Sequence, residues 1–302
     1  MQLGNLRQPP FNCTMMGALR GALDYYGSPV SDAILYGASG HAFVLNIHRE
    51  LCPSGPYCWN PEPVDALLEN VGLRREPLGF FHPGSTAEER ATVESRLRES
   101  LGAGAPCMLL NMENQLITGW DDTGFLTAQP WPGMDFPPKH LTFGSWAELG
   151  AQFHVDFHVL HRCEPADLRK AVADSLRYAV DLWRNPKAHT GEHYGMGPDG
   201  YANWSAAVEA GHGASHGNWW NGTVWAECRA RAADYFREAA PLLPSGADAA
   251  VLTGEYAAIA ARLDQCAGKE LKAGAKVALL AEAAGREDAC IARIEQAFAA
   301  MG

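Results

Sequence analysis

The sequence predicts an α+β protein of two domains, an amino-terminal domain of helices and antiparallel strands over residues 1–164 and an all-α helical domain over residues 165–302. Three observations support this. A chain of 302 residues is long enough for two domains of ordinary size. Strand-like runs occur only between residues 106 and 160, whereas beyond Pro165 apolar residues recur at three- and four-residue steps. The segment from Cys163 to Pro165 combines a charge with a proline and is typical of a domain boundary.

The first domain alternates helical and strand-like segments. Its first helix begins at Cys13, just after Pro9-Pro10, and ends at Gly27. Further helices are expected over residues 30–36, 64–70, 86–101 and 145–151. Strands are expected over residues 106–111, 115–120, 125–129 and 153–160, because these runs are apolar or β-branched and are bounded by turn residues.

The second domain is predicted to be almost entirely helical. Its helices are expected over residues 167–183, 201–210, 224–239, 248–266 and 270–298. The link over residues 211–223 is rich in Gly, His, Trp and Asn, and we expect it to be irregular. Alanine is abundant in this domain, which makes it a candidate surface for a homodimer.

Composition excludes several classes of function. A net charge of −11 argues against nucleic acid or an anionic membrane as partner. No apolar run reaches the roughly 18 residues of a membrane-spanning helix, and the start lacks the basic and apolar regions of a signal peptide, so we expect a cytoplasmic protein. Eight cysteines without any CxxC argue against a zinc knuckle or a disulfide framework. No cofactor or resident metal is expected.

Cys13 is the main candidate for a catalytic residue. It lies at the first turn of the apolar helix over residues 13–26. A thiol there meets unpaired backbone N–H groups and the positive end of the helix dipole, and both favour the thiolate. The position therefore predicts a cysteine nucleophile.

The first ~160 residues resemble the papain-like fold in its bacterial form, as in the double-glycine bacteriocin-processing peptidases and the amino-terminal domain of butirosin-biosynthesis protein H, an acyltransferase. The residues that carry this resemblance are Gln8, Cys13, Leu23-Asp24-Tyr25-Tyr26-Gly27, Ser31, Ser39-Gly40-His41-Ala42-Phe43, Gly104-Ala105-Pro106, the run from Leu116 to Asp122, and Gly144-Ser145-Trp146-Ala147-Glu148-Leu149. The resemblance implies a cysteine peptidase or acyltransferase that acts on an amide or thioester. Its substrate would be a small molecule, a peptide or a group on an acyl carrier. Cys13 would be the nucleophile, and Gln8 would help to form the oxyanion hole.

The chain departs from this family at two expected positions. The family's histidine should lie at the start of the strand that runs into Gly119, where this sequence has Glu113, Asn114 and Gln115. The family's aspartate, just before a proline, is replaced by Gln129. A thiol needs a base with a pKa near neutrality; a carboxylate is too weak for this, and an amide does not titrate. The standard dyad is therefore absent.

A replacement base could come from the last predicted strand. His154, Asp156 and His158 alternate and share one strand face. This face could orient an imidazole for Cys13, or it could hold a metal ion in a metal-dependent hydrolase. It could equally be the polar face of a half-buried strand, which is the more ordinary outcome.

The link over residues 211–223 offers another set of candidates. It contains His212, His216, Asn218, Trp219 and Trp220. Imidazoles, amides and aromatic rings in a glycine-rich loop are typical of a small-molecule pocket, but they also fasten long loops onto helical cores. Two functions therefore remain besides the metal-dependent hydrolase. One is a cysteine enzyme with a relocated base, and the other is a catalytically silent papain-fold protein that binds a ligand or partner.

Overall fold

A computed structural model describes residues 1–243 and 247–299 and divides the chain into two compact units. Unit 1 comprises Met1–Val30 and Gly72–Pro165, and unit 2 comprises Ser31–Val71 and Ala166–Gly302. The chain thus passes between the units three times. In the described parts, no helix combines the length and the apolar character that a membrane span requires.

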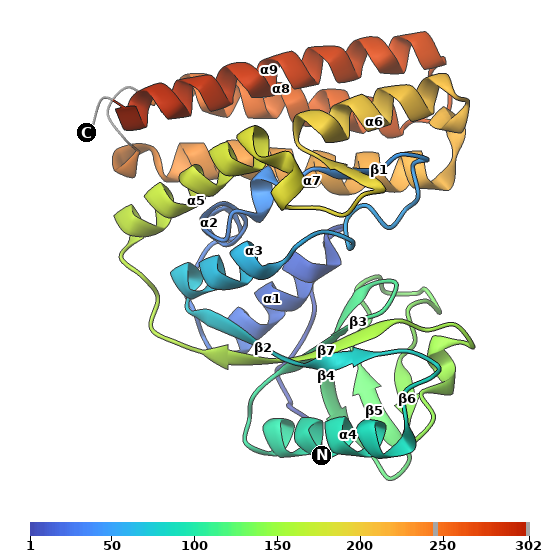
Figure 1. Cartoon of the computed structure of the whole chain (residues 1–302). Coiled ribbons are helices and arrows are strands. Elements are labelled where there is room, and N and C mark those ends of the chain that lie inside the picture. The colour runs from blue at the N-terminus through green and yellow to red at the C-terminus, as the bar shows by residue number, and fades with distance from the viewer. Residues whose placement is uncertain (244–246, 300–302) are drawn as a thin grey trace. The chain divides into compact units, whose positions relative to one another are not determined.

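Unit 1 is built on a six-stranded sheet in which every pairing is antiparallel (Figure 1). The strand order is β2-β7-β3-β4-β5-β6. In that order the strands are Leu73–Phe81, Val155–Arg162, Cys107–Leu110, Asn114–Trp120, Gly124–Thr127 and His140–Thr142. The short turn between β3 and β4 makes these two strands a hairpin.

Two helices of unit 1 pack on opposite faces of this sheet. Helix α1 (Thr14–Tyr25) covers β4, where a Cβ on Gly21 would lie 2.7 Å from the Leu116 side chain and 2.0 Å from the Arg7 carbonyl oxygen. Only glycine permits that approach, so α1 and the preceding segment pack tightly. Helix α4 (Ala87–Gly102) covers the other face, where the indole of Trp146 packs on Phe157 and donates to Glu94.

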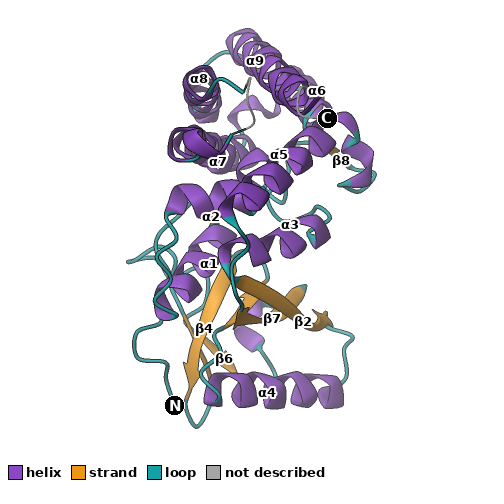
Figure 2. Cartoon of the chain, turned by 90° about the vertical axis from the view of Figure 1, so that its left-hand side faces the viewer, coloured by secondary structure: helices purple, strands orange, loops and turns teal. Residues whose placement is uncertain are grey.

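Unit 2 consists mainly of helices packed side by side (Figure 2). Its α-helices are α2 (Asp32–Ala38), α3 (Glu62–Leu67), α5 (Leu168–Arg184), α6 (Pro198–Glu209), α7 (His216–Glu238), α8 (Ala249–Ala267) and α9 (Ala273–Ala299). Helix α7 is central, since it packs against both α8 and α2. Two short strands, β1 (Asn46–His48) and β8 (Tyr194–Met196), pair antiparallel. The all-helical prediction was therefore too simple for this unit.

The α+β class agrees with the sequence analysis, but the division of the chain differs from the one expected. The last passage between the units follows Pro165, whereas the sequence predicted the boundary between residues 164 and 165. The segment over residues 31–71, however, belongs to unit 2 and not to the first domain. Helix α2 packs on α7, and β1 pairs with β8, so these residues bury their apolar surface against partners far along the chain.

Further elements differ from the sequence expectations: β6 was not expected, and the helix expected over residues 145–151 is only the 3-10 turn Ala147–Leu149. Strand β2 was not predicted, because Arg74, Glu76 and Pro77 obscure its alternating pattern. The supposedly irregular link over residues 211–223 is mostly ordered helix. A 3-10 turn over His212–Ala214 is followed by α7, which begins at His216. Ser215 caps α7 by accepting the N–H of Asn218 at 3.0 Å, and this cap outweighs the glycines that suggested a loop.

Candidate functional site

Cys13 is the N-cap residue of α1. Its backbone is extended (φ −76°, ψ 90°), its carbonyl oxygen accepts the N–H of Gly17 at 3.0 Å, and its side chain makes no capping hydrogen bond. The residue is 5% exposed. The first turn of α1 contains no acidic side chain, so nothing within that turn offsets the positive end of the helix. The helix end by itself therefore favours a thiolate at Cys13.

Gln8 lies beside this helix start, but its amide is already engaged. Its Nε2 donates to the carbonyl oxygens of Asn114 (2.9 Å) and Thr14 (3.3 Å), and its Oε1 accepts the N–H of Leu116 at 2.8 Å. An amide nitrogen carries two hydrogens, and both are directed at backbone oxygens. The predicted oxyanion role therefore does not fit this geometry, and Gln8 instead fastens the start of α1 to β4.

The start of β4 lies next to the first turn of α1, where the family resemblance placed the base. The Thr14 hydroxyl donates to the Glu113 carboxylate at 2.7 Å and accepts the N–H of Asn114 at 3.0 Å. Gln115 turns away and donates to the carbonyl oxygens of Ala128 and Pro138, both at 2.8 Å. The start of β4 thus presents a buried carboxylate, and no imidazole at residues 113–115, beside the first turn of α1.

Gln129, at the expected position of the family's aspartate, has a structural role. Its Nε2 donates to the carbonyl oxygen of Pro137, and its Oε1 is a buried atom without a hydrogen-bond partner among the described residues. Gln129 cannot take up a proton. It orders the loop after β5.

The three polar residues of β7 lie in different environments. His154 precedes the strand, and its ring stacks on the exposed ring of Phe80 at 5.9 Å. His158 is 9% exposed, and burial lowers its pKa to about 3, which makes it a poor base near neutrality. Asp156 is half-buried, and burial raises its pKa. The three side chains therefore do not act as one exposed polar face, because His154 is exposed while His158 is buried.

The residues predicted to bind a ligand at the start of α7 instead make contacts that hold helices and loops of unit 2 together. Asn218 accepts from the Trp204 indole (2.9 Å) and donates to the carbonyl oxygen of Cys266 (2.8 Å). The Trp220 indole donates to the Tyr57 hydroxyl at 2.9 Å. Trp219 is 39% exposed and packs against the rings of His216 and Trp220. Of the two predicted roles for this segment, the contacts of Asn218 and Trp220 favour fastening over a pocket.

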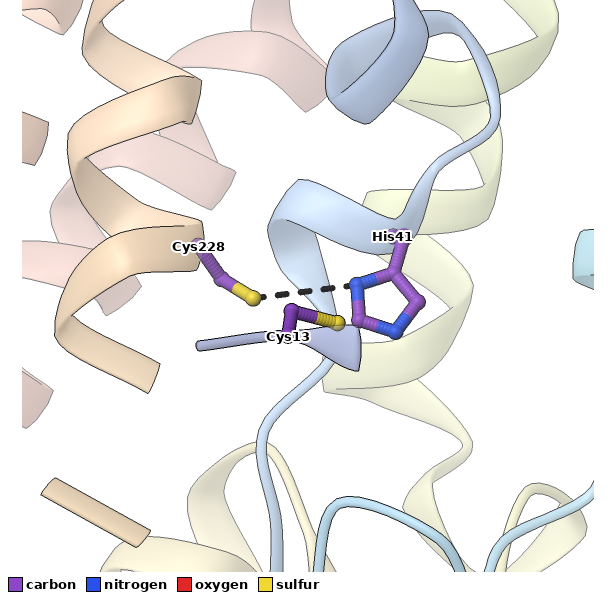
Figure 3. Close-up of side chains that lie close together, drawn as sticks. All are labelled: Cys13, His41 and Cys228. Carbon is purple, nitrogen blue, oxygen red and sulfur yellow. Dashed lines mark hydrogen bonds between the residues drawn. The ribbon is translucent and has the colours of Figure 1, made fainter. Parts of the chain in front are cut away.

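Unit 2 contains a thiol–imidazole pair that the sequence analysis did not find. The Cys228 sulfur on α7 lies 3.7 Å from Nδ1 of His41, in the 3-10 turn His41–Phe43 (Figure 3). His41 is 1% exposed, and its ring packs against those of Trp59 and Trp225. The pair is separated by 187 residues, so no local spacing could have indicated it.

A buried ion pair holds the turn that carries His41. Arg229, the residue after Cys228, donates to the carbonyl oxygens of Ala42 (2.9 Å) and Val44 (2.7 Å) and pairs with Glu287 at 2.8 Å. The Tyr201 hydroxyl also donates to Glu287 at 2.7 Å. Because all donors of this charged group are directed at oxygens, the His41 turn has one well-defined position on α7.

Neither unit, taken alone, gathers a metal site in the part of the chain that the structure describes. No group of three His, Cys, Asp or Glu ligand atoms within unit 1 or within unit 2 converges closely enough for one ion. His154, Asp156 and His158 are not such a converging group. The metal-dependent hydrolase is not supported.

Neither a protein-family model nor a curated protein sequence matches this chain.

Proposed function

We propose that this chain is a cysteine-dependent enzyme of the papain-like type, a peptidase or acyltransferase that attacks an amide or thioester carbonyl with Cys13. The observation that carries the proposal is the placement of Cys13 as the N-cap residue of α1, beside the start of an antiparallel strand. A cysteine is a poor helix cap, so its presence there calls for a chemical reason.

The reaction follows from the helix start. A base takes the proton of the Cys13 thiol, and the thiolate adds to the carbonyl carbon. The adduct then expels the amine or thiol of the substrate, which receives that proton from the base, and an acyl thioester remains on Cys13. Water or an acceptor amine then releases the acyl group. The backbone N–H groups of the first turn of α1 are the natural donors to the oxyanion, since Gln8 is engaged elsewhere.

Selective alkylation tests the nucleophile. Iodoacetamide at pH 6, followed by peptide mass spectrometry, should label Cys13 at least about tenfold faster than Cys58, since each unit by which a thiol pKa is lowered gives about tenfold more thiolate. Cys58 is an exposed thiol, and Cys107 is a buried one whose pKa burial raises to about 12. These two serve as internal controls. Labelling of Cys13 no faster than that of Cys58 would contradict the proposal.

The base is expected to be a histidine, because the start of β4 supplies none. The pH dependence of Cys13 alkylation should be compared between the native chain and the variants His154→Asn, His158→Asn and His41→Asn. Loss of the base raises the apparent pKa of the thiol, whereas a structural histidine leaves the profile unchanged. His41 is included because its imidazole already contacts a thiol within its own unit.

A catalytically silent binding protein is the second candidate, and the Glu113 carboxylate favours it. A negative charge bonded to Thr14 opposes formation of a thiolate at the neighbouring residue. The substitution Glu113→His returns an imidazole to the start of β4. In a silent protein this variant should gain turnover of an acyl thioester, while in an active enzyme with a base elsewhere it should gain none.

A further inference from the structure

A row of side chains leads across the sheet of unit 1 from the start of α1. The strand register pairs Phe80 with Asp156, Asp156 with Leu110, and Leu110 with Asn114. Cross-strand partners project to the same face of a sheet. Leu116, two residues after Asn114, shares this face and contacts α1 near Gly21. The row therefore lies on the face that α1 covers.

Exposure along the row increases with distance from α1. Asn114 is 3% exposed, Leu110 and Asp156 are half-buried, and Phe80 is 58% exposed. The backbone N–H of Asn114 donates to Thr14, the residue after Cys13. With strands about 4.8 Å apart, Asp156 lies roughly 10 Å from the Asn114 end of the row. Helix α1 thus covers the β4 end and leaves the β2 end open.

Asp156 is the one ionisable group in this row, and its two cross-strand partners are Leu110 and Phe80. Within the described residues its carboxylate makes no hydrogen bond. Burial raises its pKa, an effect that a neighbouring positive charge, Arg75, partly reverses. A half-buried carboxylate between apolar side chains is complementary to a cationic nitrogen on an apolar chain.

We propose that Phe80, Asp156 and Leu110 form the acyl-binding site of the enzyme, and that this site takes an apolar acyl chain with a protonated amine about 10 Å from the carbonyl carbon. The inference rests on the proposed function, since it needs Cys13 as the nucleophile. Phe80 and Leu110 contact the acyl chain, and the Asp156 carboxylate pairs with the ammonium group. The enzyme thereby selects substrates by the distance between the amine and the carbonyl carbon of the acyl chain.

Three alkylating reagents test this site in the full chain. They are iodoacetamide, N-octyl-iodoacetamide and N-(8-aminooctyl)-iodoacetamide, and the rate of Cys13 labelling is measured for each. The aminooctyl reagent should react about tenfold faster than the octyl reagent, as a charge-assisted hydrogen bond implies. Asp156→Asn should remove this preference, and Asp156→Glu should retain it. Phe80→Ser should slow both long reagents, while Leu168→Ser, at a 40% exposed leucine of α5, serves as the matched control.

The outcomes separate the two proposals. If iodoacetamide itself labels Cys13 no faster than Cys58, the proposed function fails. If iodoacetamide reacts quickly with Cys13 but the amine confers no advantage, or if Asp156→Asn keeps that advantage, the acyl-binding site is overturned and the nucleophile stands. The control Leu168→Ser should react with all three reagents at the native rate, and the far-UV circular dichroism spectrum of each variant shows whether it is folded.

Discussion

Helices α1 and α7 begin in opposite ways. At α7 the Ser215 hydroxyl accepts the N–H of Asn218. The side-chain amide of Asn221 donates to the carbonyl oxygens of Gly217 and Cys52, so side-chain hydrogen bonds hold the start of this helix. At α1 the cap is Cys13, whose side chain makes no such bond. The start of α1 is buried, whereas at α7 Ser215 is half-buried and His216 is exposed. The serine cap stabilises the start of α7, whereas α1 lacks a side-chain capping hydrogen bond at the residue where we propose the chemistry.

The largest expected effect concerns the polar network that supports α7. Glu287→Gln leaves the guanidinium of Arg229 buried with its charge uncompensated, and we expect a loss of about 3–5 kcal/mol in the free energy of unfolding. Chemical denaturation measures this. Glu295→Gln, which removes an exposed pair with Arg184, should cost at most about 1 kcal/mol. Equal losses in both variants would show that the buried network is not what stabilises unit 2.

The next effect is acid sensitivity in unit 1. His158 has its pKa lowered by burial to about 3, so between pH 6.5 and about 3 the unfolded chain binds a proton at this residue that the folded chain does not. Stability should fall as the pH falls through this window, by up to about 1.4 kcal/mol per pH unit from this group. His158→Leu should flatten the curve relative to the native chain. An unchanged slope in urea unfolding between pH 6 and 4 would contradict this.

A smaller effect is expected at the junction of α1 and β4. Thr14→Val removes the hydroxyl that donates to Glu113 and accepts from Asn114, and it should destabilise the fold by about 1–3 kcal/mol. Thr14→Ser keeps the hydroxyl and should recover most of this loss. Thermal and denaturant unfolding measure the stability of the two variants. Equal stabilities would show that the Thr14 hydroxyl does not stabilise this junction.

The smallest effects test the comparison itself, because they should have opposite signs. Ser215→Ala should cost about 1 kcal/mol by removing the α7 cap, whereas Cys13→Ser should gain up to about 1 kcal/mol by supplying one to α1. The same Cys13→Ser protein should lose all rapid labelling at that residue. If it were as destabilised as Ser215→Ala, the thiol would have a structural role and the contrast would not hold.

Prediction from sequence worked best where a local signal was strong. The helix at Cys13, the capped α4 and the hairpin of β3 and β4 all follow from capping and alternation in short windows. The prediction was wrong for β2, because charged residues and a proline hide the pattern on an edge strand. It was also wrong for residues 211–223, where the Ser215 cap and distant partners such as Cys266 override the local composition.

The candidate site shows the same limit. Cys13 was found because a helix start is a local feature. The row from Asn114 to Phe80 depends on strand register, and the pair of His41 and Cys228 depends on packing across 187 residues. The position of the missing base could be read from the resemblance. What replaces it, a carboxylate bonded to Thr14, becomes visible only in three dimensions.

The three crossings of the chain between the units also set an order of assembly during synthesis. Unit 1 has all of its residues once position 165 is made, and it can then close its sheet. Helix α2 and strand β1 are made early, but β8 follows β1 by about 150 residues and α7 follows α2 by about 180. The apolar side chains of residues 31–71 therefore remain exposed after unit 1 has folded and until α7 and β8 have been made. Cys13 belongs to unit 1, so the proposed nucleophile can be in place before unit 2 is complete.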